Sequence, residues 1–319
     1  METIAVLCSG GDAPGMNAAL RAIVRTAVFN GMRIYGIRNG FRGLIDRDIE
    51  QLKVHSVSDI IHRGGTVLGS ARSERFYKEQ GQEQAYQVLK DYEIDGLIVL
   101  GGDGSFKGAM ELSKRGINVI GIPCTIDNDL GYTTYTIGFY TAVETVLESI
   151  GRLRDTSSSH GIGVIVEVMG RHCGDIALYA GLAGGAESVI VPEVEFDLDE
   201  LEAKITNGKK RGKKHQIIIK AEGVQRTQEL CEILEERTGI DFRTTILGHV
   251  QRGGSPSAFD RVTASRMGSM AVELLVDKKD NLAIATDGHN LHTISLQEAI
   301  DTPHQFNREM YRVMRELSI

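Results

Sequence analysis

Three short apolar runs in this chain are each followed directly by a loop of glycine, aspartate and hydroxyl residues. The runs are 4–7, 97–100 and 119–122, and the loops are 9–12 (SGGD), 101–105 (GGDGS) and 123–129 (PCTIDND). Such runs are typical of strands buried in a parallel sheet. In open α/β sheets, ligands bind at the carboxyl ends of the strands, where these loops would lie. The pattern therefore predicts a ligand site built from several strand ends.

Strand-like runs alternate with helix-like segments through most of the chain. The predicted strands also include 32–37, 163–168, 188–191 and 216–221. The predicted helices are 16–29, 82–92, 106–114, 142–153, 199–206, 228–238 and 260–276. This alternation indicates an α/β fold with parallel sheets covered by helices on both faces. The length of 319 residues favours two domains, and the polar segment 152–163 is predicted to be an exposed loop.

Composition excludes several classes of function. The formal net charge is −7, so a generally basic nucleic-acid surface is not indicated. No run reaches the roughly 18 apolar residues that a membrane span needs. The first strand is expected at Thr3, which leaves no room for a signal peptide. The four cysteines have no metal-binding spacing, and we expect a cytoplasmic protein in a reducing compartment.

The loops carry the groups that phosphoryl transfer needs. Glycines let backbone N–H groups approach a phosphate, and the helix opened by Gly104 and Ser105 would add its positive end. Carboxylates can hold Mg²⁺ or accept a proton from a sugar hydroxyl. Asp127 and Asp129, two residues apart, could face one side of an extended segment, or could only shape an Asx turn. Neither a Walker loop nor a dinucleotide fingerprint follows a strand.

Basic residues in glycine-rich segments indicate anion binding. Arg72, Arg171 and Arg252 lie in or beside glycine-containing turns, and the arginine fork suits a phosphate group. The dense basic run 209–215 (KKRGKKH) is either a solvated turn or a second anion site, and we favour the second. A nucleic-acid patch is disfavoured because no aromatic residues are interleaved with the charges.

Over essentially its whole length, the chain closely resembles the bacterial ATP-dependent 6-phosphofructokinase family. The motifs that carry this resemblance are SGGDAPGMNAA, GGDGS, TIDND, EVMGRH, KAEGV and GHVQRGGSP. The resemblance implies two similar Rossmann-like three-layer α/β/α domains with mostly parallel sheets. Residues 1–138 and 251–301 would form an ATP-binding domain, and residues 139–250 and 302–319 a sugar-phosphate-binding domain. It also implies a cytoplasmic homotetramer regulated by an effector, ADP or phosphoenolpyruvate, with no nucleic-acid or membrane partner.

The same resemblance implies a role for individual residues. Asp127 would be the general base for the 1-hydroxyl of fructose 6-phosphate, assisted by Thr125, Arg171 and the N–H of Gly11. ATP with Mg²⁺ would be held by Gly11, Arg72, Ser73, Gly102, Asp103, Gly104 and Ser105, with Asp103 supporting the metal. The sugar phosphate would contact Thr125, Ile126, Asp127, Met169, Gly170, Arg171, Glu222, His249, Val250, Gln251 and Arg252, with Arg243 from a neighbouring subunit. The effector would bind Arg21, Arg25, Arg154, Gly185, Glu187, Arg211, Lys213, Lys214 and His215.

A few positions bear on the substrate. Pyrophosphate-dependent relatives typically carry Asp at position 104 and Lys at 124, so Gly104 and Cys124 favour ATP. Ile162 replaces the usual arginine, and Tyr132, Thr134 and Cys124 also depart from the family pattern. The lost arginine contact would weaken sugar-phosphate binding by on the order of 1.5–3 kcal/mol. A kinase for another ketose phosphate, such as tagatose or sedoheptulose phosphate, and a catalytically weak regulatory paralogue are the alternatives. We also expect a thiol reagent at Cys124 to affect activity.

Overall fold

The computed structural model describes residues 2–224 and 226–318. The chain forms two compact units. Unit 1 comprises Met1–Ile126, Leu130–Thr141 and Arg252–His304, and unit 2 comprises Asp127–Asp129, Ala142–Gln251 and Gln305–Ile319. The assignment of ATP to one domain and sugar phosphate to the other stays a prediction.

Unit 1 contains a seven-stranded sheet with the order β11-β10-β5-β4-β1-β2-β3. Its strands are β1 (Thr3–Cys8), β2 (Arg33–Ile37), β3 (Ile49–Gln51), β4 (Gly96–Gly101), β5 (Asn118–Pro123), β10 (Leu282–Asp287) and β11 (Asn290–Ser295). Every neighbouring pair is parallel except the two at the edges, β2 with β3 and β10 with β11. The central strands β1 and β4 are buried along their whole length, which explains their unbroken apolar composition.

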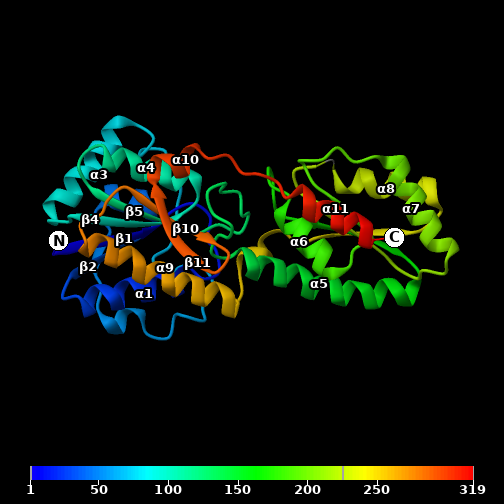
Figure 1. The fold of residues 1–319 in the computed structure, drawn as a ribbon, viewed down its shortest axis with the longest axis horizontal. Coiled ribbons are helices and arrows are strands. Elements are labelled where there is room, and N and C mark those ends of the chain that lie inside the picture. The colour runs from blue at the N-terminus through cyan, green and yellow to red at the C-terminus, as the bar shows by residue number, and fades with distance from the viewer. Residues whose placement is uncertain (1, 225, 319) are drawn as a thin grey trace. The chain divides into compact units, whose positions relative to one another are not determined.

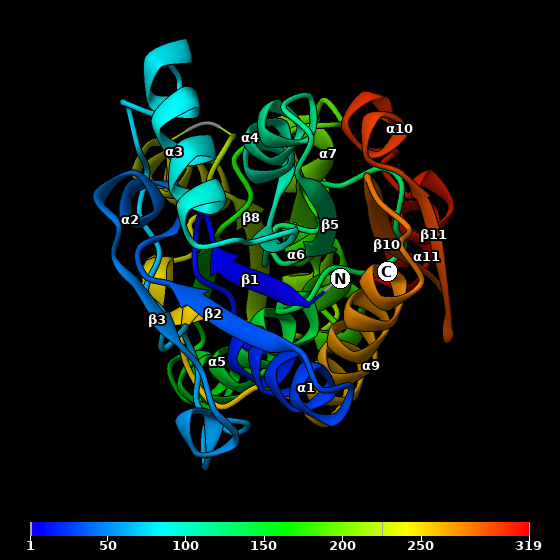
Figure 2. The same cartoon turned by 90° about the vertical axis from the view of Figure 1, so that its left-hand side faces the viewer.

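Helices cover both faces of this sheet. They are α1 (Met16–Phe29), α2 (Gly40–Asp46), the 3-10 turn η1 (Val54–Val57), α3 (Glu79–Asp91), α4 (Asp103–Ser113), α9 (Ala258–Val276) and α10 (Leu296–Asp301). Figures 1 and 2 show α1 and α9 together on one face, with α3, α4 and α10 on the other. Close contact between α1 and α9 requires Gly268, because a Cβ there would lie 2.6 Å from the carbonyl oxygen of Ala19.

Unit 2 contains a four-stranded parallel sheet with the order β7-β8-β6-β9. Its strands are β6 (Gly163–Val168), β7 (Ser188–Ile190), β8 (Gln216–Ala221) and β9 (Phe242–Ile246). The remaining helices are α5 (Phe139–His160), α6 (Asp175–Gly184), α7 (Leu198–Lys210), α8 (Thr227–Thr238), the 3-10 turn η2 (Gly248–Arg252) and α11 (Arg308–Leu317). Ile218 packs with α7 and α8, while its neighbour Ile219 faces Gly181 of α6, so the two faces of β8 are covered by different helices.

The α/β class with mostly parallel sheets is confirmed, but the prediction of an exposed loop over 152–163 is wrong. Helix α5 continues to His160, so most of that segment is helical. Arg152 pairs with Glu148 one turn earlier, and the Ser159 hydroxyl donates to the carbonyl of Asp155 at 2.8 Å. These i to i+4 contacts satisfy polar side chains within the helix. Among the described residues, no helix is long and apolar enough to cross a membrane.

Candidate active site

In unit 1, the loops after β1, β4 and β5 lie side by side at one edge of the sheet. The N–H of Ser9 donates to the carbonyl of Leu100 at 2.9 Å, and the N–H of Cys124 donates to Gly101 at 3.0 Å. These two bonds join each loop to its neighbour. The prediction that several strand ends form one edge therefore holds for unit 1.

The GGDGS loop forms the N-terminus of α4. Gly101 has no room for a side chain, because a Cβ would lie 2.4 Å from the Ser105 hydroxyl and 2.5 Å from the Ser9 carbonyl oxygen. A Cβ on Gly104, in contrast, would enter open space, with no described atom beyond its own helix turn within 4 Å. Gly102 precedes the helix, and Asp103 begins it. The first N–H groups of a helix have no partner within the helix, so this exposed turn can receive an anion.

Two further segments of unit 1 lie against the glycine loop after β1. A Cβ on Gly11 would lie 2.3 Å from a guanidinium nitrogen of Arg252, so this arginine covers the glycine directly. The same nitrogen donates to the carbonyl of Asp12 at 3.3 Å. The Ser70 hydroxyl reaches the carbonyl of Gly10 at 2.5 Å. The exposed Arg72 follows two residues later, and Ser73 caps a turn by accepting from the N–H of Phe76 at 3.3 Å.

The carboxylate of Asp103 is accessible at the start of α4. It pairs with Lys107 at 2.7 Å, and its side chain is 45% exposed. Mg²⁺ is usually held by one or two carboxylates together with substrate phosphates rather than by a full protein cage. A single exposed carboxylate beside an anion-binding helix end fits that pattern.

Thr125 and Ile126 follow β5 at the same edge. The Thr125 carbonyl accepts from the Thr136 hydroxyl at 2.7 Å, and Ile126 is fully buried. Cys124 is also buried, and desolvation holds the pKa of its thiol well above its usual range. Since the thiolate is the reactive form, this finding opposes the expectation of a reagent-sensitive Cys124.

In unit 2, three segments meet at the carboxyl ends of β6, β8 and β9. The N–H of Met169 donates to Oε1 of Gln251 at 3.2 Å, and the N–H of Glu222 donates to the carbonyl of Val168 at 2.9 Å. A Cβ on Gly223 would lie 1.9 Å from the carbonyl oxygen of Arg171. The predicted sugar-phosphate residues after these strands are thus brought together, and Arg171, Glu222, His249 and Val250 are exposed there.

Gly170 is required by the shape of the β6 loop. Its φ of +121° lies in a region that favours glycine, and a Cβ would lie 2.2 Å from the carbonyl oxygen of Cys173. Any side chain at this position would displace the backbone that carries Arg171.

The segment 127–129 belongs to unit 2 although it follows a strand of unit 1. The Asn128 amide donates to the carboxylate of Asp175 at 2.9 Å, and both side chains are buried. Asp175 is the first residue of α6, the helix that follows the Met169–Arg171 loop. This contact brings the segment carrying Asp127 to the start of α6.

Arg243 is not part of this cluster. It is the second residue of β9 and is paired in register with Val164, near the amino end of β6. Its guanidinium donates to the carbonyl of Phe242 at 2.7 Å and lies 3.5 Å from Glu235. Ile162 lies at the same edge, directly before β6. Val164 and Met169 are five residues apart, so about 16 Å of strand, at roughly 3.3 Å per residue, separates this edge from the Met169 loop.

A second cluster in unit 2 surrounds the buried carboxylate of Glu187. One carboxylate oxygen lies 2.9 Å from Lys213 and 3.7 Å from the ring of His215, and the other accepts the N–H of Ile217. Arg154 of α5 donates to the carbonyls of Gly184 and Gly185, at 2.5 and 3.2 Å. The structure thus brings most of the predicted effector residues of unit 2 together.

The other predicted effector residues stand apart from these contacts. Arg211 and Lys214 are exposed on the turn after α7. Arg21 and Arg25 are one helical turn apart on α1, in unit 1. Their part in an effector site stays a prediction.

Sequence reasoning missed a buried polar network beneath the sugar-phosphate loops. Lys220 of β8 is fully buried and lies 3.2 Å from the carboxylate of Glu167 in β6. Thr227 donates to the same carboxylate, and Lys220 also donates to the carbonyl of Ala221 at 3.1 Å. The signal was a lysine that directly follows the apolar run 217–219 within the predicted strand 216–221. The network holds together the ends of β6 and β8, which carry the exposed site residues.

Comparisons with known proteins agree with this architecture. A sequence model of the family described as phosphofructokinase matches residues 3–275. A protein of Finegoldia magna named ATP-dependent 6-phosphofructokinase is 58% identical over 319 residues, with all of both chains covered. One of Alkaliphilus metalliredigens with the same name is 55% identical over the same span. The chain belongs to the phosphofructokinase family.

Solved structures of phosphofructokinases share the fold. The enzyme of Saccharomyces cerevisiae superposes with a TM-score of 0.89 at 33% identity, covering all of this chain and 47% of that one. The enzyme of Pichia pastoris, described in its T-state, gives a TM-score of 0.90 at 32% identity, covering 99% of this chain and 39% of that one. The fold described above is therefore that of the family.

Proposed function

We propose that this chain is an ATP-dependent 6-phosphofructokinase. It transfers the γ-phosphoryl group of ATP to the 1-hydroxyl of fructose 6-phosphate and releases ADP and fructose 1,6-bisphosphate. The observation that carries this proposal is the edge of unit 1, where glycine loops and the N-terminus of α4 present backbone N–H groups beside Asp103. The names of full-length relatives at 55–58% identity support the same reaction.

The glycine at position 104 favours ATP as the phosphoryl donor. The open space around Gly104 leaves room for the α-phosphate and the nucleoside beyond it. A carboxylate here would repel an anion at the same helix end. Asp103, with the bound phosphates, would hold Mg²⁺, which neutralises charge on the transferred group.

Transfer then depends on positioning and on charge. Asp127 accepts the proton of the sugar 1-hydroxyl as the oxygen attacks phosphorus. Thr125, Arg171 and the N–H of Gly11 stabilise the charge on the phosphoryl group during transfer. The exposed side chains at the strand ends of unit 2, including Arg171 and Glu222, orient the sugar.

The sugar phosphate also requires a neighbouring copy of the chain. Arg243 lies at the amino edge of the unit 2 sheet, too far along the strand to reach the Met169 loop of its own chain. An arginine there can serve a sugar phosphate bound to another subunit, as expected in a homotetramer. Ile162 shares this edge, and it favours a second candidate, a kinase for another ketose phosphate with different contacts at the phosphate end.

Regulation would act through the Glu187 cluster. Lys213 and His215 lie at the buried carboxylate of Glu187, and Arg154 holds the carbonyls of Gly184 and Gly185 just before it in the chain. Such a cluster can bind an anionic effector such as ADP or phosphoenolpyruvate. Arg21 and Arg25 would complete the site.

The direct test of the mechanism is Asp127→Asn. Removal of the base should lower kcat by about 10²–10⁴-fold while the KM for fructose 6-phosphate changes much less. Asp91→Asn, on the surface of α3, is the matched control because its carboxylate is half exposed and pairs with the exposed Arg47. A kcat for Asp127→Asn within a few-fold of the control would rule out the assigned base.

A further inference from the structure

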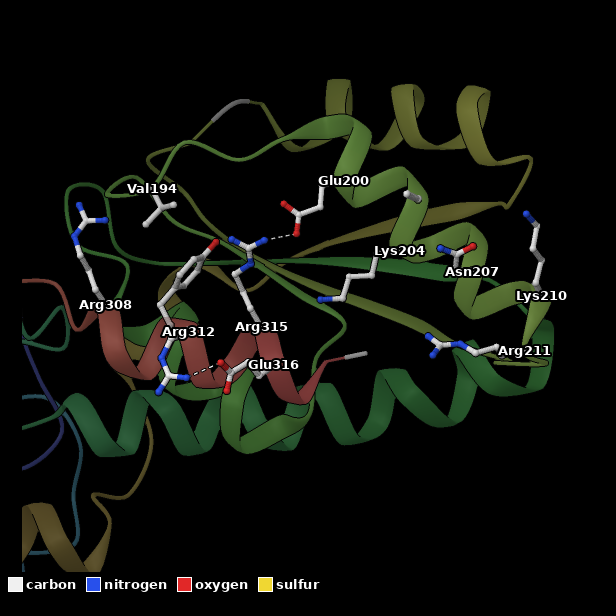
Figure 3. Close-up of a pocket in the computed structure, with 12 residues that line it drawn as sticks. Val194, Glu200, Lys204, Asn207, Lys210, Arg211, Arg308, Arg312, Arg315 and Glu316 are labelled. Carbon is white, nitrogen blue, oxygen red and sulfur yellow. Dashed lines mark hydrogen bonds and ion pairs between the residues drawn. The ribbon is translucent and has the colours of Figure 1, made fainter.

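A large pocket lies in unit 2 outside both clusters described above. It has a volume of about 1030 Å³ and lies between α7 and α11 (Figure 3). Drug-sized ligands occupy pockets of roughly 300–1,000 Å³, so a small metabolite would fit. None of Arg154, Gly185, Glu187, Lys213 and His215 lines it; Arg211 is the one predicted effector residue at its rim.

The pocket is strongly basic. Six cationic side chains and two carboxylates line it, although the chain as a whole carries a net charge of −7. On α11, Arg308, Arg312 and Arg315 follow at i, i+4 and i+7, which places them on one face of the helix. The opposite wall of the pocket is formed by α7, which carries Lys204, and by Arg211 directly after the end of that helix (Figure 3). Because the lining cations outnumber the lining carboxylates, the pocket has a local field that attracts anions.

Several of these cations are available to a ligand. Among the described residues, Lys210, Arg211 and Arg308 form no ion pair within 4 Å. Arg312 pairs with Glu316 on its own helix, at 2.5 Å. Arg315 pairs with Glu200 across the pocket. Burial lowers the pKa of the half-buried Lys204 from its usual 10.5, while the carboxylate of Glu200 acts in the opposite direction.

The walls also offer apolar surface. Val194, Ala203 and the ring of Tyr311 line the pocket, and the Tyr311 hydroxyl is directed to the carbonyl of Val189 at 3.4 Å. A ligand with a carbon skeleton can therefore contact these groups while its anionic groups meet the arginines.

We propose that the pocket between α7 and α11 binds a small metabolite carrying two or more phosphate groups. The arginine fork binds two phosphate oxygens at once, and three arginines on one helix face suit an extended polyanion better than a single anion. Glu200 and Glu316 hold two of the arginines until the ligand replaces them. The site does not depend on the phosphoryl-transfer proposal, because none of the residues that line it is among those predicted to bind ATP or the sugar phosphate.

The test is calorimetric titration of the full chain with inorganic tripolyphosphate. Arg308→Gln/Arg312→Gln removes two cations of the pocket, and Lys114→Gln/Lys279→Gln is the control, which removes one paired and one unpaired surface cation of unit 1. Binding at the ATP and effector sites contributes equally to both variants, so their difference reports on the pocket. We expect the double arginine variant to lose a binding component, with affinity weakened about tenfold or more, while the control matches the wild type.

A second variant tests whether removing a carboxylate from the pocket strengthens tripolyphosphate binding. Glu200→Gln releases Arg315 and should strengthen tripolyphosphate binding a few-fold, which a damaged fold would not do. Equal isotherms for the two double variants would overturn the proposal, as would weaker binding by Glu200→Gln. A change in molar mass of Arg308→Gln/Arg312→Gln in light scattering with unchanged tripolyphosphate binding would also overturn it, and would assign the pocket to a second copy.

Discussion

Ile162 lies at the amino edge of the unit 2 sheet together with Arg243, where the family resemblance implies a second arginine. Ile162→Arg should therefore lower the half-saturating fructose 6-phosphate concentration by about tenfold or more, because a charge-assisted hydrogen bond contributes on the order of 1.5–3 kcal/mol. The value of kcat should change little, since this contact would be made to the substrate's phosphate and not to the reacting atoms. Initial rates across sugar concentrations measure both effects.

Ile162→Gln is the matched control, because it adds polarity without charge. An equal gain for Gln and Arg would show that charge is not the missing element. No gain for Arg would mean that this edge does not face a sugar phosphate.

Cys124 gives a second prediction for a single side chain. Its pKa is raised well above 9.0 by burial, so the thiol stays protonated at pH values where an exposed cysteine is partly ionised. Iodoacetamide at mildly alkaline pH should leave Cys124 unmodified in the native protein and alkylate it after denaturation, as mass spectrometry of peptides would show. Fast native labelling of Cys124 together with loss of activity would contradict this expectation.

At the scale of the element, two glycines of the GGDGS loop should respond differently to alanine: Gly101, at the end of β4, and Gly104, in the first turn of α4. Gly101→Ala places a Cβ 2.4–2.5 Å from Ser105 and Ser9, so the joined loops must move apart. Gly104→Ala enters open space and should fold normally. We expect thermal unfolding to show a loss of about 2 kcal/mol or more for Gly101→Ala and less than 1 kcal/mol for Gly104→Ala.

Comparable stability of the two alanine variants would argue against the packing assigned to this loop. Gly104→Asp extends the test to the donor, because its carboxylate would raise the KM for ATP in a protein that is still folded.

The sequence was sufficient for elements whose local pattern matches their final environment. The apolar runs of β1, β4, β6 and β8 were predictable because both faces of a parallel sheet are buried. The end of α5 was not, because its many polar residues resemble a loop in composition, although Ser159, for example, hydrogen-bonds to a carbonyl one turn back within the helix. The hairpin of β10 and β11, at the edge of the unit 1 sheet, also went unpredicted.

Long-range contacts determine which parts of the candidate site could not be predicted from the sequence. Glycines and aspartates after strands indicated where the phosphate edge would form. The assignment of segment 127–129 to unit 2 depends on the Asn128–Asp175 hydrogen bond, between residues 47 apart in the chain. The amino-edge position of Arg243 depends on the register of β9 against β6. Neither is encoded in a local pattern, so only the structure could supply them.

At the scale of the whole molecule, charge is distributed unevenly. The chain carries a net charge of −7, yet basic side chains gather around Glu187, in the pocket between α7 and α11, and at the loops that carry Arg171 and Arg252. Basic side chains gathered at such places in a chain of negative net charge would attract small anions to them. This arrangement suits a protein whose proposed substrates and effectors are all phosphorylated.

The most direct measurement is the initial rate of fructose 1,6-bisphosphate formation with Mg²⁺, comparing ATP with pyrophosphate across fructose 6-phosphate concentrations. Saturable turnover with ATP, and little or none with pyrophosphate, is the predicted result, because the open space at Gly104 and the phosphate edge of unit 1 suit a nucleotide donor. Turnover with pyrophosphate alone, or no turnover with ATP at any sugar concentration, would contradict the central claim that this chain is an ATP-dependent 6-phosphofructokinase.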